Sequence, residues 1–364
     1  MADAVVAGHL SLDIIPDLFV HAAGKFDSAF QPGRLVHVGP ATISTGGAAS
    51  NTGLALHRLG IDTHIIAKVG SDQFGQIVSQ IIASHAPHLA DGISVSTKTS
   101  TSYTVIVSPP GGDRRFLHHP GVNDDFGADD IRDEDVRDAR LFHFGYPPLM
   151  ACMFADGGAQ LTEMFRRVKS LGLTTSLDVA FPDLDSPAGQ ADWHTILKNT
   201  LPYVDIFLPS LDEILFMLKR NSNTTLSMQS LFEVSDELLA MGTKMVALKL
   251  SDRGLYLRVA PADVLQGLGR ARPTDINKWA NYENWFPCFQ VDVVGTTGSG
   301  DATIAGFLAA LLRDMPPAEA MNAALGVGAC SVEAADALSG IRSWDETQRR
   351  ISAGWARCSE NITP

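Results

Sequence analysis

Residues 291–312 read Val-Asp-Val-Val-Gly-Thr-Thr-Gly-Ser-Gly-Asp-Ala-Thr-Ile-Ala-Gly-Phe-Leu-Ala-Ala-Leu-Leu. An apolar, strand-like run leads into a turn of threonine, glycine and serine, and a strongly apolar helix follows. Gly298, Ser299 and Gly300 would place backbone N–H groups at the helix N-terminus with little side chain in the way. The first N–H groups of a helix have no partner within it and, with the helix dipole, attract anions. The stretch therefore predicts an anion hole suited to a phosphate.

Asp301 follows this turn and falls in the first turn of the predicted helix. A carboxylate there can accept the proton of a hydroxyl while a phosphoryl group is transferred to that hydroxyl. The helix dipole is expected to keep Asp301 ionised, so it would be a weak base that mainly orients the hydroxyl. The same residues also fit an ordinary capped helix start without any catalytic role. The rest of the sequence is needed to distinguish a catalytic Asp301 from an ordinary helix cap.

The composition restricts the class of protein. The chain has 364 residues, of which 45% are hydrophobic and 19% charged, enough for one large α/β domain or two ordinary ones. A net charge of −13 without a long basic run argues against nucleic-acid partners. No window approaches the ~20 apolar residues of a membrane span, and the N-terminus lacks a signal-peptide pattern. The four cysteines form no CxxC pair, so we expect a cytoplasmic protein without a zinc site or disulfides.

Hydrophobic runs and helical patterns alternate along the chain. Strands are predicted at residues 4–8, 62–67, 140–146, 173–178, 204–208 and 244–250. Helices are predicted at residues 47–60, 71–84, 156–170, 191–200, 211–219, 229–241, 301–313, 317–334 and 344–357. This order predicts an α/β fold with a mostly parallel central sheet and helices on both faces.

Residues 15–42 and 99–119 interrupt the alternation. The first stretch contains a strand-like Leu-Val-His-Val at 35–38, and the second has the turn chemistry of a β-hairpin around Pro109–Asp113. We expect the two stretches to pair into a small β-sheet lid. The remaining segments, 1–14, 43–98 and 120–364, would form the nucleotide- and substrate-binding core. Residues 259–290, rich in aromatic side chains, are interpreted as a loop insertion packed on this core.

Several common motifs are missing from the sequence. It contains no GxxxxGK[ST], GxGxxG, HExxH or GxSxG. The chain is therefore neither a P-loop protein nor a dinucleotide-binding protein with the Rossmann fingerprint, and motifs typical of zinc proteases and α/β-hydrolases are absent.

The stretch 291–312 resembles the C-terminal signature of the ribokinase-like (PfkB) carbohydrate kinase family, Asp-Thr-Thr-Gly-Ala-Gly-Asp-Ala-Phe followed by an Ala-Gly-Phe helix. The matching residues are Thr296, Thr297, Gly298, Gly300, Asp301, Ala302, Ala305, Gly306 and Phe307. Three further segments, in the family's order, resemble its N-terminal Gly-Gly-x-x-x-Asn signature, the segment after it and the lid turn: residues 46–51, 69–75 and 112–116. The resemblance covers nearly the whole chain.

The resemblance implies a ribokinase-like fold and transfer of the γ-phosphate of ATP, with Mg²⁺, to a hydroxymethyl group of a small sugar. It makes Asp301 the base and Gly298, Ser299 and Gly300 the anion hole. Acceptor hydroxyls would be bound by Asp13, Gly46, Gly47 and Asn51. The nucleotide would be bound by Lys249, Ser251, Gly254, Thr296, Gly298 and Gly300. Mg²⁺ would be held near Glu213 and Ser210, and Asp178 matches the family's aspartate after the central strand.

The chain departs from the family pattern at three positions. Gly295 replaces an aspartate that helps to hold a monovalent cation, which puts a potassium requirement in doubt. Ser210 replaces an asparagine of the Mg²⁺ segment, and Ser251 replaces a glycine near the nucleotide. A nucleoside or other small alcohol stays open as the acceptor, and so does a non-catalytic protein that only binds sugar or nucleotide. Because unpaired lid strands tend to associate, a homodimer through the lid is expected.

Overall fold

A nine-stranded sheet runs through the computed structural model, in the order β13-β12-β11-β10-β9-β8-β1-β4-β5. The structure describes residues 2–18, 32–33, 35–108, 115–220, 226–359 and 362. The parallel strands are β1 (Ala4–Gly8), β4 (Thr63–Gly70), β5 (Ile93–Ser96), β8 (Leu141–Gly145), β9 (Thr174–Asp178), β10 (Ile206–Phe207) and β11 (Met245–Lys249). The antiparallel strands are β12 (Leu255–Val259) and β13 (Glu283–Phe286). The predicted α/β class with a mostly parallel sheet is confirmed.

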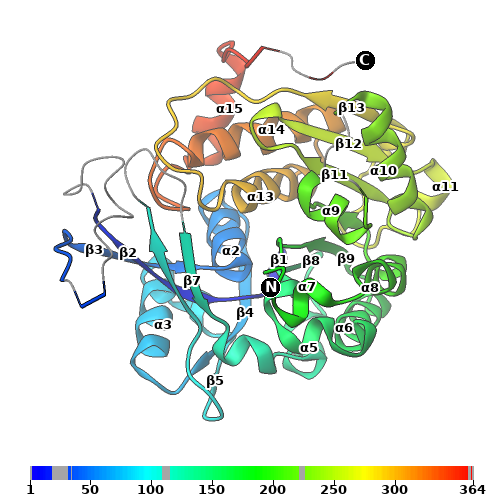
Figure 1. Ribbon diagram of the computed structural model, residues 1–364. Coiled ribbons are helices and arrows are strands. Elements are labelled where there is room, and N and C mark those ends of the chain that lie inside the picture. The colour runs from blue at the N-terminus through cyan, green and yellow to red at the C-terminus, as the bar shows by residue number, and fades with distance from the viewer. Residues whose placement is uncertain are drawn as a thin grey trace.

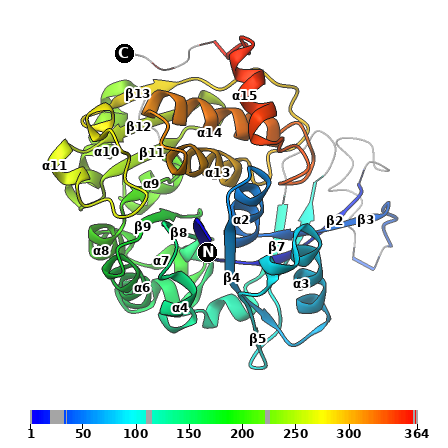
Figure 2. The same ribbon diagram turned by 180° about the vertical axis from the view of Figure 1, so that it is seen from behind.

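Helices cover both faces of this sheet (Figures 1 and 2). Alternate side chains of a strand point to opposite faces, and β1 shows this directly. Ala4 and Val6 belong to one hydrophobic core, whereas Val5 and Ala7 belong to another. The first core includes side chains of α2 (Ala48–Arg58), α13 (Ser299–Leu312) and α14 (Pro317–Ser331). The second includes side chains of α6 (Ala159–Ser170), α8 (Trp193–Thr200) and α10 (Met228–Ala240).

Helix α13 is apolar around nearly its whole circumference, as expected for a helix buried on all sides. It packs between α2 and α14 in both views (Figures 1 and 2). This packing fixes the N-terminus of α13, and with it the position of Asp301. The other helices are α3 (Gln73–His85), α4 (Asp133–Val136), α5 (Ala151–Phe154), α7 (Pro187–Gln190), α9 (Leu211–Met217), α11 (Ala262–Leu265), α12 (Ile276–Trp279) and α15 (Trp344–Ser352). No helix in the described ranges is long and apolar enough to cross a membrane.

A second sheet of four strands projects to one side of the molecule, left in Figure 1 and right in Figure 2. Its order is β3 (Ala41–Gly46), β2 (Ser11–Pro16), β6 (Tyr103–Val107) and β7 (Arg115–His119). Strand β2 pairs with β6, and β6 pairs with β7 as an antiparallel hairpin. The small sheet that the sequence predicted beside the central one is confirmed. The predicted turn at Pro109–Asp113 lies outside the described residues.

The strand predicted at residues 35–38 is wrong. Residues 35–40 are described and carry no strand, whereas the strands lie on either side, at Ser11–Pro16 and Ala41–Gly46. Residues with a high strand propensity form a strand only where a partner strand is available. Here β2 pairs with β3, and residues 35–38 are not part of either strand. The small sheet therefore takes in residues 11–14 and 43–46, which the sequence analysis had assigned to the core. The division of the chain into core and lid itself stays a prediction.

Residues 259–290 are packed on the core. The segment contains α11, α12 and β13, and β13 adds an edge strand to the large sheet. Trp279 is fully buried in the first hydrophobic core, against Phe307 of α13. The insertion thus supports the helix that carries Asp301.

Candidate active site

The candidate site lies where the carboxyl ends of β8, β9 and β11 meet the N-terminus of α13. Open α/β sheets bind their ligands at this end of the strands. Tyr146 follows β8, Asp178 ends β9 and Lys249 ends β11. Tyr146 is hydrogen-bonded to Asp301 of α13, and Lys249 to Asp178. Residues distant in sequence are thereby brought together.

The carboxyl group of Asp301 is 1% exposed and accepts three hydrogen bonds. Asn51 Nδ2 donates to Oδ2 at 3.0 Å and Thr52 Oγ1 donates to Oδ1 at 3.3 Å. Tyr146 OH donates to Oδ2 at 2.7 Å. Burial raises the pKa of Asp301 above its ordinary value, and these donors oppose that rise. The expectation that the helix dipole keeps Asp301 ionised stays a prediction, and burial of this carboxyl group acts against it.

Tyr146 is a site residue that the sequence analysis missed. Its backbone is left-handed, with φ 67° and ψ 43°, although it is not glycine and precedes Pro147. That conformation costs about 1–2 kcal/mol, and strain of this kind often gathers at functional sites. Burial raises the pKa of Tyr146 well above its ordinary value, and Asp301 adds to the rise, so the phenol stays a neutral donor. The only local signal was a tyrosine followed by two prolines at a strand end.

Asp13, Gly46 and Gly47 form one wall of the predicted acceptor site. Asp13 is 7% exposed on β2, accepts a hydrogen bond from Ser11 Oγ at 3.1 Å, and burial raises its pKa to about 6. A side chain on Gly46 would clash with the carboxyl group of Asp13. Gly47 has φ 91°, and a side chain there would clash with the carbonyl of His9. Neighbouring groups of the chain thus require glycine at both positions.

Asn51 connects this wall to the base. Its Nδ2 group donates a hydrogen bond to Asp301, whereas its Oδ1 is buried and has no hydrogen-bond partner within the described residues. Buried side-chain oxygens nearly always have a partner in the functional state. Oδ1 is therefore placed to accept a hydrogen bond from a hydroxyl beside Asp301.

The predicted anion hole is at the start of α13. Gly298 caps the helix with φ 71°, a left-handed conformation that suits glycine. Ser299 N–H donates a long hydrogen bond of 3.4 Å to the carbonyl of Thr296, so this N–H is partly engaged. A side-chain carbon on Gly300 would lie 3.6 Å from Lys249 Nζ. The helix N-terminus therefore has an ammonium group beside it, and both features favour an anion.

Lys249 forms an ion pair with Asp178, and 2.6 Å separates Nζ from Oδ1. Burial alone would lower the pKa of Lys249, but the carboxylates of Asp178 and Glu213 outweigh burial and raise it. Burial also raises the pKa of Asp178 well above its ordinary range, although Lys249 opposes that shift. The short contact and the surrounding carboxylates favour Lys249 as a cation.

Ser210 and Glu213 form the N-terminal cap of α9. Ser210 N–H donates to Glu213 Oε2 at 2.7 Å, the reciprocal arrangement of a capping box. Burial raises the pKa of Glu213, and Lys249 opposes the rise. Within the described ranges, no group of three His, Cys, Asp or Glu side chains could hold a metal ion by itself.

Ser251 and Gly254 lie in the turn between β11 and β12. Ser251 is exposed and has φ 56°, which explains why a glycine suits this position. Gly254 has φ 105°, and a side chain there would clash with the carbonyl of Phe286 on β13. Gly295, which replaces the family's aspartate, is equally confined, since an added side-chain carbon would lie 2.8 Å from the carbonyl oxygen of Ala334.

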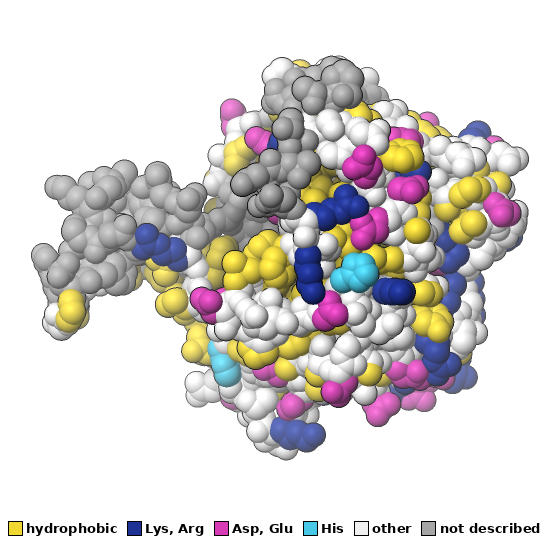
Figure 3. Space-filling view, turned by 45° about the vertical axis from the view of Figure 1, so that its right-hand side comes forward, with side chains coloured by type: hydrophobic (Ala, Val, Ile, Leu, Met, Phe, Trp, Pro, Cys, Tyr) yellow, Lys and Arg dark blue, Asp and Glu magenta, His cyan; other side chains and the backbone are white. Residues whose placement is uncertain are grey.

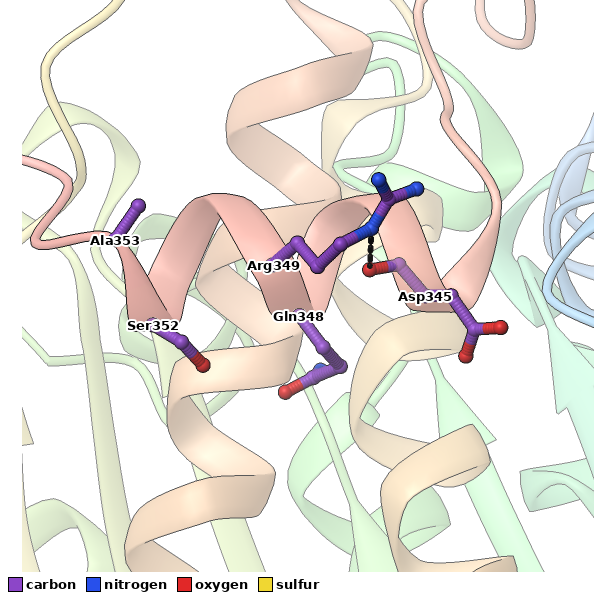
Figure 4. A pocket seen from close by; sticks show the side chains of 5 residues that line it. All are labelled: Asp345, Gln348, Arg349, Ser352 and Ala353. Carbon is purple, nitrogen blue, oxygen red and sulfur yellow. Dashed lines mark hydrogen bonds between the residues drawn. The ribbon is translucent and has the colours of Figure 1, made fainter.

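Two other surface features give no indication of a binding site. A hollow on α15 is lined by four residues of that helix and the residue after it: Asp345, Gln348, Arg349, Ser352 and Ala353 (Figure 4). Binding sites usually gather polar groups from several elements, as the site around Asp301 does. On the face seen in Figure 3, basic side chains are interspersed with acidic ones, without the continuous basic surface that nucleic acids require.

This geometry defines a site suited to phosphoryl transfer, and comparison with known proteins agrees. The model of the pfkB family carbohydrate kinases matches residues 2–344. An uncharacterized sugar kinase from Archaeoglobus fulgidus is 28% identical over 264 residues, 71% of this chain and 87% of that protein. Fructokinase-2 from Zea mays is 24% identical over 313 residues, 84% of this chain and 79% of that protein.

The fold has solved counterparts. The crystal structure of a fructokinase with bound ATP from Xylella fastidiosa has a TM-score of 0.73 at 18% identity, covering 97% of this chain and 99% of that chain. This likeness confirms the ribokinase-like fold. The chain belongs to the pfkB family of carbohydrate kinases. It is an ATP-dependent carbohydrate kinase, as its sequence predicted.

Proposed function

We propose that the enzyme transfers the γ-phosphoryl group of ATP to a hydroxymethyl group of a small sugar or sugar-like alcohol, with Asp301 as the base. One observation carries the proposal: a buried carboxyl group, held by Asn51, Thr52 and Tyr146, sits in the first turn of α13 with Lys249 nearby. A base, an anion hole and a cation are the parts that phosphoryl transfer needs.

The acceptor hydroxyl would bind between Asp301 and Asn51, and Asn51 Oδ1 would accept a hydrogen bond from the acceptor. The hydroxyl oxygen forms a bond to the γ-phosphorus, the bond from that phosphorus to the β–γ bridging oxygen breaks, and the hydroxyl proton passes to Asp301. Lys249 and the N–H groups at Gly298–Gly300 would stabilise the charge on the transferring group. The products are the phosphorylated acceptor and ADP.

The nucleotide would lie along Lys249, Ser251, Gly254 and Thr296. Mg²⁺ usually binds nucleotide phosphates with only one or two protein carboxylates and several waters. Glu213 and Asp178 supply such oxygen donors near Lys249, so the residues fit the ion, with Ser210 fixed as the helix cap beside them. When bound, Mg²⁺ would neutralise phosphate charge.

The small sheet would act as a lid that closes over the acceptor and excludes water, which otherwise would hydrolyse ATP. Its strands and the neighbouring segment expose large apolar side chains: Leu35, Val38, Ile43, Phe116 and Leu117. We propose that these residues support a homodimer through the lid, which light scattering after size-exclusion chromatography would test. The four cysteines are free, which supports a cytoplasmic location.

A nucleoside acceptor is the second candidate. The rings of His9, His118 and Tyr146 lie side by side in the acceptor region, with centroids 5.1 Å and 6.3 Å from that of His9, and could pack against a base. A purely sugar- or nucleotide-binding role is disfavoured, because it would need no buried carboxyl group at the anion hole.

The test is ADP release from ATP and Mg²⁺ with a panel of pentoses, hexoses, polyols, sugar acids and nucleosides. Release that depends on a sugar supports the proposal and names the acceptor class. Release with nucleosides alone would select the second candidate. Nucleotide binding without release on any acceptor would contradict a kinase acting on these alcohols.

A further inference from the structure

His9 lies between β1 and β2 and is an unusual buried histidine. Its side chain is 3% exposed, and neither Nδ1 nor Nε2 has a hydrogen-bond partner within the described residues. Buried His143, by contrast, has Nδ1 within 3.0 Å of Ser176 Oγ. Buried polar groups are nearly always paired, so two unpaired nitrogens on one ring indicate a partner that is not part of the protein chain.

The surroundings of His9 place that partner in the acceptor site. A side-chain carbon on Gly47 would lie 2.5 Å from Nδ1 of His9, so the ring faces the glycine wall next to Asp13. The ring centroid is 5.1 Å from that of His118, on lid strand β7, and 6.3 Å from that of Tyr146. The imidazole therefore lies between the lid and the core.

Tyr146 has His9 beside its ring and the base at its phenol oxygen. The hydroxyl of Tyr146 reaches Asp301 at 2.7 Å, while its ring packs near His9. A ligand group at His9 would therefore lie beside the ring of Tyr146, whereas the reacting hydroxyl would lie near the phenol oxygen, at Asp301. His118 is less free to bind a ligand, because its Nδ1 is 3.0 Å from Thr104 Oγ1.

The imidazole of His9 is neutral. Burial lowers its pKa well below the ordinary value, and neighbouring His118 lowers it further. A neutral imidazole offers one N–H donor and one acceptor nitrogen. A hydroxyl group can serve either nitrogen, whereas a phosphate would require a charged imidazolium or further cations.

We infer that His9 is a specificity-determining residue of the acceptor site. Its imidazole forms a hydrogen bond with a hydroxyl of the acceptor other than the one that is phosphorylated. The acceptor is then a polyhydroxy compound with at least one hydroxyl near its lid-facing side. This inference rests on the proposed function, because it assumes that the acceptor binds beside Asp301, Asn51 and Asp13.

The test uses His9→Phe, which keeps a planar ring without nitrogens, and His9→Asn, which keeps a donor and an acceptor. His57→Gln, at the partly exposed end of α2, is the control. For each acceptor that supports ADP release, kcat/KM is compared with that of its monodeoxy analogues, for example D-ribose against 2-deoxy-D-ribose. The apparent KM for ATP and the melting temperature are measured for every variant.

For one hydroxyl position, the ratio of kcat/KM for the acceptor to kcat/KM for its deoxy analogue should be about 3- to 10-fold higher in the wild-type enzyme than in His9→Phe. This is the range expected for one neutral hydrogen bond. His9→Asn should keep part of this preference. Discrimination at other hydroxyls and the KM for ATP should not change. A structural role would instead lower kcat/KM for all analogues equally.

Failure of the inference about His9 can be distinguished from failure of the proposed function. If wild-type enzyme turns over an acceptor and His9→Phe keeps every preference, the inference about His9 is overturned while the proposed function stands. If His9→Phe is unfolded, the same comparison on His9→Asn and His9→Gln decides. If no polyhydroxy acceptor supports ADP release by wild-type enzyme or raises its melting temperature, the proposed function fails and the inference fails with it.

Discussion

The phenol of Tyr146 donates a 2.7 Å hydrogen bond to Oδ2 of Asp301. Asn51 donates to the same oxygen at 3.0 Å, whereas Oδ1 accepts a longer bond of 3.3 Å from Thr52. The two oxygens of the base are thus unequal. In the proposed mechanism an acceptor hydroxyl would displace Tyr146 from Oδ2 or use Oδ1, and the hydrogen bond from Tyr146 would lower the pKa of the base while it is in place.

Tyr146→Phe should move the acid limb of the pH profile of kcat/KM to higher pH, by about one pH unit. Asp301 acts as a base only when ionised, so activity rises as pH passes through its pKa. Loss of a donor to the ionised form raises that pKa further, and one hydrogen bond of ~1.4 kcal/mol corresponds to one pH unit. The measurement is kcat/KM against pH for both enzymes. An unchanged acid limb would mean that Tyr146 does not tune the base.

Ser251→Gly should stabilise the protein by about 0.5–1 kcal/mol. The backbone of Ser251 is left-handed, with φ 56°, which glycine adopts without the side-chain clash. Urea unfolding should show the gain. Ser251→Ala keeps a side-chain carbon in the same conformation and is the matched control, for which no gain is expected. Equal stability of both variants would show that the position is not strained.

Asp13→Asn should stabilise the fold at pH 7 and weaken acceptor binding. Burial raises the pKa of Asp13 from 3.8 to about 6, so above pH 6 the folded protein bears the cost of a buried charge. In linkage terms, the folded state binds the proton more tightly than the unfolded state, so this group favours folding at low pH and loses that contribution as pH rises from about 4 to 6.

The free energy of unfolding of Asp13→Asn should therefore exceed that of the wild type by about 2 kcal/mol at pH 7, and the difference should shrink towards pH 4. Denaturant unfolding at both pH values measures it. The opposite trend, with the variant losing stability at pH 7 relative to pH 4, would show that Asp13 is stabilised as a carboxylate in the free enzyme.

Potassium should not activate the enzyme. Gly295 stands where the family resemblance places an aspartate, and its Cα faces the carbonyl of Ala334 too closely for a side chain. The rates of ADP release in potassium chloride and in tetramethylammonium chloride should agree within about twofold at equal ionic strength. Charge screening is then the same in both salts, and no site that binds potassium specifically is expected. Strong activation by potassium alone would show that other groups complete a cation site.

Much of the fold could be predicted from the sequence because it is locally encoded. The apolar run at residues 4–8 predicted β1, and the helix predicted at residues 47–60 agrees closely with α2. Gly60, shortly after α2, has the left-handed φ of 80° that is typical of a helix end. Asp301 and Asn51 were both selected from the family resemblance, although 250 residues separate them. Their direct hydrogen bond was not predicted.

The errors and omissions have a common physical origin in long-range packing. Residues 35–38 have strand-forming side chains but form no strand, because β2 pairs with β3 instead. Burial by distant elements raises the pKa of Asp301, and the sequence does not show that burial. His9 has no sequence pattern that marks it, and Tyr146 has only the two prolines that follow it, because their proposed roles depend on which groups they meet across the sheet.

The most direct test of the central claim compares Asp301→Asn with Asp236→Asn, an exposed carboxylate that pairs with Arg258 on the surface. Both variants are assayed for acceptor-dependent ADP release and for ATP binding by calorimetry. We expect Asp301→Asn to lower kcat by about 10²- to 10⁴-fold with ATP binding retained, whereas Asp236→Asn should leave kcat unchanged. A kcat of Asp301→Asn within a few-fold of the wild type, with ATP still bound, would contradict the role of Asp301 as the base.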